Sequence, residues 1–206
     1  MRQRALRGAL LSDKRAFEKE NEMSENKAEK ILVVIDMQKD FIDGALGTAE
    51  AVDIVDNVVD KIKSYDPENV YATRDTHPVD YLQTQEGQNL PVEHCIEGTE
   101  GWQLDPKIAP LIREDHIFDK PTFGSTELAD KLSSLNDHTP GGIEIELVGL
   151  CTDICVVSNA LLFKAEMPEV RISADASCCA GVTPEKHEAA LATMESCQIH
   201  ITGGAE

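Results

Sequence analysis

Residues 31–36 read Ile-Leu-Val-Val-Ile-Asp, and this stretch decides the fold class. Five consecutive aliphatic residues without alternation are typical of a strand that is buried on both faces, as in a parallel sheet covered by helices. Further strands are predicted along the rest of the chain, over 69–73, 116–118, 143–149, 170–174 and 198–202.

The segments between these strands carry apolar residues at helical spacing, clearest over 51–64. Other helices are predicted over 105–112, 126–135, from Gly149 to about Lys164, and over 184–197. Strands that alternate with helices predict an α/β protein with a mostly parallel sheet. Ligands of such sheets bind beyond the carboxyl ends of the strands, so the polar residues directly after each strand are the candidates for a site.

The length of 206 residues fits one domain. We expect an N-terminal arm over 1–29 and a single catalytic domain over 30–206. Acidic residues outnumber basic ones by 38 to 19, which gives a net charge of −19. The arm holds seven basic and six acidic residues, so the acidity belongs to the domain. Such a charge argues against binding to nucleic acid or to an anionic membrane surface.

The first residues do not read as a targeting segment. The apolar patch at 9–11 is too short for a signal peptide, and the acidic residues around it do not fit a transit peptide. No apolar run approaches the ~18 residues of a membrane span. Six cysteines without a C-x-x-C pair suggest reduced thiols, so we expect a cytoplasmic protein. The arm would then be a frayed or helical extension, or lie upstream of a start near Met23.

The ends of the first two predicted strands carry carboxylates and imidazoles. Asp36 follows the first strand and is either a general base or the cap of the next turn. Asp75 and His77 follow the second strand on one side of an extended stretch, and Glu86 and His94 come later in an irregular segment. This set suits zinc, manganese or iron, although an Asp-x-His spacing also occurs by chance.

The ends of the third and fourth predicted strands carry a lysine and two cysteines. Lys120 precedes a proline and is either part of a site or an ordinary surface lysine. If Thr152 caps the following helix, Cys155 lies in its first turn, where the helix lowers a thiol pKa and offers free backbone N–H groups. A nucleophile and an oxyanion hole fit this position; core thiols at Cys151 and Cys155 are the alternative.

Five motifs occur in an order that resembles a known family: IDMQKDF at 35–41, ATRDTH at 72–77, HCIEGTEGW at 94–102, DKPTFGS at 119–125 and GLCTDICV at 149–156. Over about residues 31–201 the chain resembles the isochorismatase-like cysteine hydrolases, and among them the nicotinamidases. The resemblance implies a three-layer α/β/α fold with a mostly parallel six-stranded sheet.

The same resemblance implies a role for each strand-end residue. Cys155 matches the nucleophile, Asp36 the base that takes its proton, and Lys120 the cation beside them. The backbone amides of Cys151 and Cys155 match the oxyanion hole, and the family commonly has a cis peptide just before the position of Cys151.

A divalent metal is also implied by the resemblance, with zinc as the first choice and manganese or iron as alternatives. Asp75, His77 and His94 match three ligands; we choose Glu86 as the fourth, with Gln83 as its competitor. In nicotinamidases the metal binds the pyridine nitrogen of the substrate. Relatives that act on open-chain amides often lack it, so its presence favours a pyridine carboxamide.

The walls of the substrate site match less completely. Phe41 matches an aromatic wall position, and Phe123 is a second candidate. Some nicotinamidases have a tryptophan just before the last metal histidine, where this chain has Leu90 to Glu93, and Trp102 is expected to pack elsewhere. This departure concerns the substrate more than the chemistry. A true isochorismatase is not expected, because it lacks the nucleophilic cysteine.

The expected function is therefore hydrolysis of nicotinamide to nicotinate and ammonia through a cysteine thioester, a reaction of pyridine nucleotide salvage. NAD is not expected as a cofactor, because no G-x-G-x-x-G follows a strand. The alternatives are another small-amide hydrolase, with a carbamoyl, maleamate or ureido substrate, or a non-catalytic thiol protein that uses Cys151 and Cys155. The expected partner is a small amide, and the oligomeric state stays open, a homo-oligomer included.

Overall fold

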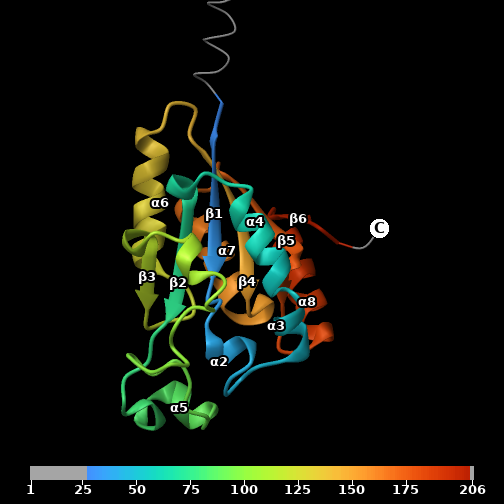
Figure 1. Ribbon diagram of the computed structural model, residues 1–206. Coiled ribbons are helices and arrows are strands. Elements are labelled where there is room, and N and C mark those ends of the chain that lie inside the picture. The colour runs from blue at the N-terminus through green and yellow to red at the C-terminus, as the bar shows by residue number, and fades with distance from the viewer. Residues whose placement is uncertain (1–26, 205–206) are drawn as a thin grey trace, which may run out of the picture.

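The computed structural model describes residues 27–204 (Figure 1). The predicted arm over 1–29 lies outside this range except for its last three residues, and the first strand already begins at Glu29. Within the described range, every helix is too short or too polar to cross a bilayer.

Six strands form one sheet, in the order β3-β2-β1-β4-β5-β6. Every neighbouring pair is parallel, so the α/β prediction is confirmed and the sheet is parallel throughout. The strands are β1 (Glu29–Ile35), β2 (Val70–Asp75), β3 (Ile117–Lys120), β4 (Ile143–Leu150), β5 (Arg171–Ala180) and β6 (His200–Thr202).

Helices cover both faces of this sheet and complete the three layers (Figure 1). One face is covered by α3 (Ala49–Asp53) and α4 (Val55–Lys63). The other is covered by α6 (Thr126–His138), α7 (Val157–Glu166) and α8 (Pro184–Ser196). Two short helices, α2 (Lys39–Ile42) and α5 (Gln85–Asn89), follow the carboxyl ends of β1 and β2.

The aliphatic run of β1 explains why both faces need a cover. Ile31, Val33 and Ile35 belong to the core under α6, α7 and α8, whereas Leu32 and Val34 belong to the core under α3 and α4. All five side chains are fully buried. Because successive side chains of a strand point to opposite faces, an unbroken apolar run contributes to both cores.

Three predicted elements differ from the structure. The helix expected over 51–64 is interrupted at Ile54 and forms α3 and α4. The helix predicted over 105–112 is wrong: only a 3-10 turn, Ala109–Leu111, forms there, because Pro110 has no N–H and disfavours helical geometry in the residue before it. The strand predicted to end at 174 continues to Ala180 as β5.

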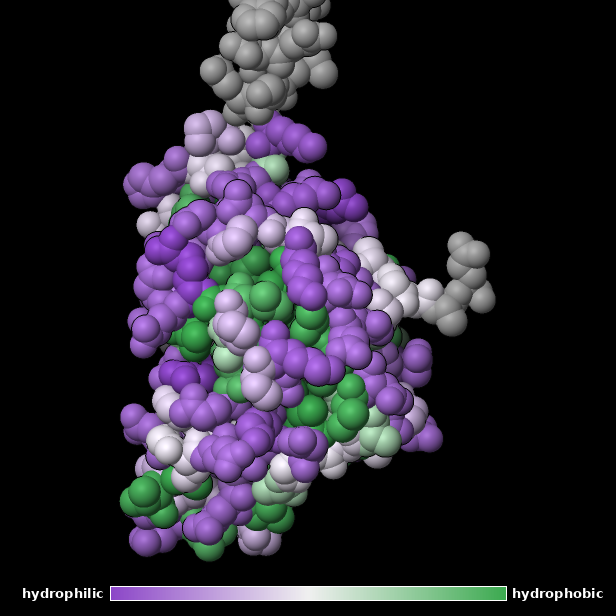
Figure 2. Space-filling model, viewed as in Figure 1, coloured by the Kyte–Doolittle hydropathy of each residue, from purple (hydrophilic) through white to green (hydrophobic). Residues whose placement is uncertain are grey.

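The segment around α5 projects beyond the carboxyl ends of β1, β2 and β3 (Figure 1). Its tip exposes hydrophobic groups, as do areas in the middle of the same face (Figure 2). Val79 and Leu82 are the most exposed large hydrophobic residues of this segment. The predicted irregular stretch over 83–101 therefore contains one short helix, and it stands over the edge of the sheet where the site is expected.

Candidate active site

Four neighbouring strands bring the candidate residues to one edge of the sheet. Asp36 follows β1, Asp75 ends β2, Lys120 ends β3, and Cys155 lies just after β4. Asp36 has a φ of 46°, a left-handed conformation that aspartate tolerates better than most residues. This turns the chain out of β1 and leaves the Asp36 side chain completely buried.

Lys120 joins Asp36 and Cys155 into a buried group. Its Nζ lies 2.8 Å from Oδ2 of Asp36 and 3.5 Å from Sγ of Cys155. Lys120 is only 1% exposed, so the surface-lysine alternative is wrong. Asp36 is not a cap either, because its Oδ1 accepts a hydrogen bond from the hydroxyl of Thr73 at 2.6 Å. The three residues expected to act together do lie together.

The protonation of this group follows from burial and charge. Burial raises the pKa of Asp36 above its usual value, even though the charge of Lys120 opposes the rise. Burial and the charge of Asp36 raise the pKa of Cys155 well above normal, so the expected lowering by a helix terminus does not prevail. Burial lowers the pKa of Lys120, but the negative charges around it, first that of Asp36, outweigh this effect and the pKa is raised. At rest the site thus pairs a neutral thiol with a basic carboxylate.

The turn that carries Cys155 differs from the prediction. Thr152 is not the N-cap; the cap is Cys151, and a π-helical turn, Thr152–Val156, leads into α7. The peptide bond between Leu150 and Cys151 is cis, as the resemblance implied. The hydroxyl of Thr152 is not available for capping, because it lies 2.8 Å from Nδ1 of His187.

Gly149 allows this turn to approach Asp36. Its φ is 118°, and a Cβ added there would lie 2.1 Å from the carbonyl oxygen of Ile35. Only glycine therefore permits β4 to run so close to the end of β1. Asn159 then holds the turn from below: its Nδ2 donates to the carbonyl of Cys155 at 2.8 Å, and its Oδ1 accepts from the amide of Ser125 at 2.9 Å.

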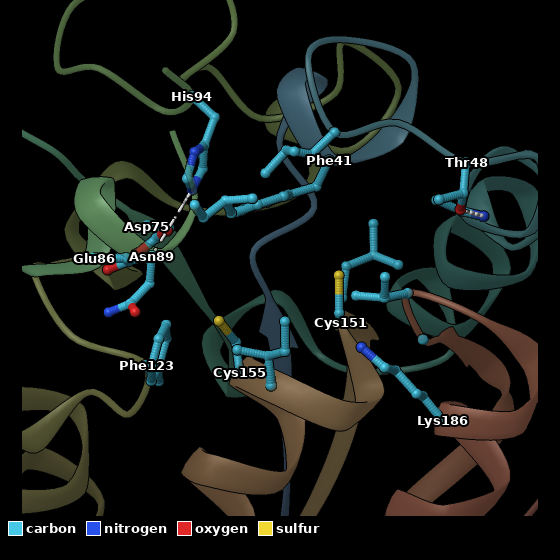
Figure 3. A pocket seen from close by; sticks show the side chains of 17 residues that line it. Phe41, Thr48, Asp75, Glu86, Asn89, His94, Phe123, Cys151, Cys155 and Lys186 are labelled. Carbon is cyan, nitrogen blue, oxygen red and sulfur yellow. Dashed lines mark hydrogen bonds and ion pairs between the residues drawn. The ribbon is translucent and has the colours of Figure 1, made fainter. Parts of the chain in front are cut away.

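Asp75, His77, Glu86 and His94 form a second cluster, and their ligand atoms all lie within 4.8 Å of one another. Nε2 of His77 is 3.0 Å from Oδ2 of Asp75 and 3.7 Å from Oε1 of Glu86. Glu86 reaches into the cluster from α5, whereas its competitor Gln83 is exposed. The four residues chosen as metal ligands are thus brought together; Figure 3 shows Asp75, Glu86 and His94 of this cluster.

Two observations show that this cluster fits a metal ion. Nε2 of His77 is buried but has no hydrogen-bond partner among the described residues, although the Asp75 carboxylate is close. Nδ1 of His94 lies 2.8 Å from the carbonyl oxygen of Val92, so it donates there and leaves Nε2 as a lone-pair donor facing the cluster. Two imidazoles and two carboxylates are a donor set for zinc or a similar divalent metal.

Asp75 belongs to both groups at once. Its Oδ1 is 3.2 Å from Nζ of Lys120, and its Oδ2 faces His77. Burial raises the pKa of Asp75, but the His77 ring and the Lys120 charge outweigh it, so the pKa is lowered and the carboxylate is ionised. Gln38 fixes its backbone, because Gln38 Nε2 donates to the Asp75 carbonyl at 2.8 Å and Oε1 accepts from the Asp75 amide at 2.7 Å.

The supporting residues were not predicted from the sequence. Tyr81 is fully buried, and its ring centroid lies 4.7 Å from that of His77 and 5.0 Å from that of His94. Asp40 accepts a hydrogen bond from the amide of Cys95, the residue after His94, at 2.8 Å. Asp40 lies inside the first motif, which was the only signal for it.

A cavity of about 350 Å³ lies over both groups, with largely apolar walls (Figure 3). Phe41 and Phe123 line it, as expected of aromatic wall residues, and Cys151 and Cys155 lie along its floor. Trp102 packs elsewhere: the Arg74 guanidinium lies 3.7 Å from its ring centroid, and its Nε1 donates to the hydroxyl of Thr76. The volume is in the usual range for small-molecule sites.

Comparisons with known proteins agree with this geometry. The model of the isochorismatase domain matches residues 30–206. The uncharacterized isochorismatase family protein PncA of Bacillus subtilis (strain 168) is 29% identical over 143 residues, which cover 64% of this chain and 76% of that protein.

Among solved structures, the pyrazinamidase of Pyrococcus horikoshii in complex with zinc has a TM-score of 0.70 at 28% identity, covering 85% of this chain and 99% of that one. The nicotinamidase/pyrazinamidase PncA from Bacillus subtilis also has a TM-score of 0.70 at 28% identity, covering 84% and 99%. The N-carbamoylsarcosine amidase from Thermoplasma acidophilum shares the fold, with a TM-score of 0.65 at 21% identity over 86% and 98%.

Proposed function

The chain belongs to the isochorismatase family, and from this premise we propose that it is a metal-containing cysteine amidohydrolase that converts nicotinamide and water to nicotinate and ammonia. Family membership supports the general part of this proposal, that the protein is a hydrolase of this family. The proposal adds the substrate, the metal and the residue roles. The observation that carries it is the buried Asp36–Lys120–Cys155 group beside the four-residue cluster, under one cavity.

The first half of the reaction forms a thioester. Sγ of Cys155 attacks the carboxamide carbon, and the thiol proton passes to Asp36, whose raised pKa makes it an effective base. Lys120 stays charged throughout and balances the negative charge that moves between the carboxylate and the sulfur, because it contacts both. The backbone amides of Cys151 and Cys155 would stabilise the oxyanion.

The second half releases the products. The bond between the carbonyl carbon and nitrogen breaks, and Asp36 returns its proton to the leaving ammonia. A water molecule then attacks the thioester with Asp36 as base, the carbon–sulfur bond breaks, and the proton restores the Cys155 thiol. The carboxylic acid formed gives its remaining proton to solvent and leaves as nicotinate, and each residue regains its starting protonation state.

The metal cluster would orient the ring. Asp75, His77, Glu86 and His94 would hold the ion, and a bound zinc ion would supply a Lewis-acid contact to the pyridine nitrogen. Phe41 and Phe123 then flank the ring from the cavity wall. Zinc is favoured by the donor set and by the relative that was solved with zinc.

The second candidate function is hydrolysis of an open-chain amide. It is retained because no aromatic residue stands just before His94. The thiol-redox alternative loses support, because burial raises the pKa of Cys151 to about 12 and redox-active thiols need a low pKa.

Ammonia release from a panel of amides, with and without a chelator, tests the proposal. We expect nicotinamide to be the best substrate among the neutral amides, Cys155→Ala to abolish its turnover, and the chelator to suppress it. The matched control is Cys197→Ala, since Cys197 is an exposed thiol outside the cavity. A folded wild-type protein, loaded with zinc, that releases ammonia from no amide would contradict the proposal.

A further inference from the structure

The cavity extends well beyond the part that a nicotinamide molecule needs. At one end lie the metal cluster and Phe123, and Cys155 and Cys151 lie along its middle (Figure 3). The other end is formed by Thr48 and Lys186 (Figure 3). A ring held at the cluster with its carboxamide at Cys155 would occupy the first part and leave the part beyond Cys151 open.

Lys186 gives this far end a positive charge. It lies in the first turn of α8, and its side chain extends toward Cys151 and the cavity (Figure 3). It is the only lysine or arginine among the residues that line the cavity. The lining of the cavity is otherwise largely apolar and includes Leu46, Ala51 and Ile154. Thr48 is the other polar side chain at this end (Figure 3).

Lys186 also lacks a carboxylate partner. Within residues 27–204 no carboxylate oxygen lies within 4.0 Å of its Nζ, whereas Lys61 and Lys107 form ion pairs at 2.6 and 2.7 Å. Asp153 is close in the fold, but its Oδ1 accepts a hydrogen bond from the amide of Val182 at 2.9 Å. In a chain with a net charge of −19, an unpaired cation at the cavity is free to bind an anion from outside.

We propose that Lys186 is a specificity-determining residue that binds a carboxylate of the substrate, at the cavity end opposite the metal cluster. Besides nicotinamide, the cavity then accepts small amides that carry a carboxylate in addition to the carboxamide, and Lys186 raises their turnover relative to matched neutral amides. The inference rests on the proposed amide hydrolysis and leaves its steps unchanged: the same carbon–nitrogen bond breaks at Cys155.

Two matched pairs of amides test this, each differing by one carboxylate. Nicotinamide is compared with 5-carbamoylpyridine-3-carboxylate, and succinamide with succinamate, by kcat/KM for ammonia release. We expect the anionic member to be preferred in at least one pair. Lys186→Met should lower the anionic-to-neutral ratio about tenfold, as for loss of one charge-assisted hydrogen bond, and Lys186→Glu should lower it further.

The matched control is Lys131→Met, because Lys131 is also an exposed lysine on a helix but does not line the cavity. It should keep the wild-type ratio. If wild type hydrolyses nicotinamide but prefers the neutral member of both pairs, or if Lys186→Met keeps the ratio, the role of Lys186 is overturned while the amidohydrolase proposal stands. If wild type hydrolyses no amide at all, both fail.

Discussion

Asp75 uses its two carboxylate oxygens for two different purposes. One oxygen faces Lys120 in the catalytic group, and the other faces His77 in the metal cluster. The Asp75 side chain therefore connects Lys120, which contacts Cys155, to the residues that would hold the ion. Substitution of Asp75 should therefore disturb both groups. Among the described residues, no other member of the four-residue cluster forms an ion pair with Lys120.

Asp75→Asn is accordingly expected to lose both metal and activity. The amide cannot supply an anionic ligand, so zinc affinity should fall by about 100-fold or more. Zinc content after dialysis against a buffered zinc concentration measures this directly. Asp119→Asn serves as the control, because Asp119 is exposed and pairs with Arg74 outside the cluster. Equal zinc content in Asp75→Asn and wild type would contradict the assignment of this ligand.

Thr73→Val provides a pH test of Asp36 as the base. Burial raises the pKa of Asp36, and the hydrogen bond from Thr73 lowers it in part. The base must be ionised, so kcat/KM should fall as the pH falls through this pKa. Valine removes the hydrogen bond, raises the pKa further and should move the acidic limb to higher pH.

The pH profile of kcat/KM measures that shift. Thr202→Val is the control, because Thr202 is exposed on β6, away from Asp36. A profile of Thr73→Val that superimposes on wild type would exclude Asp36 as the group that titrates.

Residue roles differed in how far the sequence could predict them. Asp36, Lys120 and Cys155 were found because each lies at or soon after the end of a strand, and their motifs resemble a family. Gln38 and Tyr81 were missed, because their roles depend on contacts with Asp75 and with the two histidines, which are distant in the chain and meet only in the fold. The thiol pKa was misjudged, since burial beside Asp36 outweighs a helix terminus.

At the scale of elements, the position of α5 depends on one close backbone contact. Gly87 follows Glu86, and a Cβ at Gly87 would lie 2.1 Å from the carbonyl oxygen of Tyr81. The helix can lie against the 3-10 turn Tyr81–Gln83 only because this residue has no side chain. The sequence does not show this contact, because an isolated glycine in an irregular segment is also compatible with an ordinary loop.

Gly87→Ala should therefore push α5 away and withdraw Glu86 from the cluster. We expect zinc affinity to fall at least about tenfold, with a loss of about 1–3 kcal/mol in the free energy of unfolding. Competition with a chelating dye measures the affinity. Gly204→Ala is a matched control, because an added Cβ there meets nothing within 4 Å. Unchanged zinc affinity in Gly87→Ala would show that α5 does not position Glu86.

The ion pairs between α4 and the sheet yield a second element-scale prediction. Nζ of Lys61 lies 2.6 Å from Asp175 and 3.1 Å from Glu146. Burial raises the pKa of Asp175, but hydrogen bonds from Lys61 and Ser177 outweigh it and lower the pKa. A lowered folded-state pKa stabilises the protein above the unfolded pKa of about 3.9 and loses this effect as the pH falls.

Asp175→Asn should lower the free energy of unfolding by about 1–3 kcal/mol at pH 7, and the difference from wild type should shrink below about pH 4. Urea unfolding at several pH values measures it, with Asp137→Asn, an exposed aspartate of α6, as the control. A difference that stays constant from neutral to acidic pH would exclude the ion pair as its cause.

On the scale of the whole molecule, the alternation of strands and helices predicted the three layers correctly, because an apolar run such as 31–35 can be buried only between two covering layers. The exact bounds and types of the short elements could not be predicted from this alternation. The segment over 105–112 has helical spacing, yet Pro110 limits it to one 3-10 turn. The net charge of −19 did not help to predict any helix or strand, but it gives the molecule that surrounds the site a negative electrostatic field.

The arrangement of the strands also makes activity a reporter of one part of the fold. The side chains of Asp36, Lys120 and Cys155, and those of Asp75 and His77 from the four-residue cluster, lie at or just after the ends of β1, β2, β3 and β4, which are consecutive neighbours in the sheet. The strand β6, at the opposite edge of the sheet from β3, supplies none of them. Transient opening of β6, seen as rapid amide hydrogen exchange, should therefore cost little turnover, whereas any fluctuation that separates β1 from β4 should stop the reaction as soon as it begins.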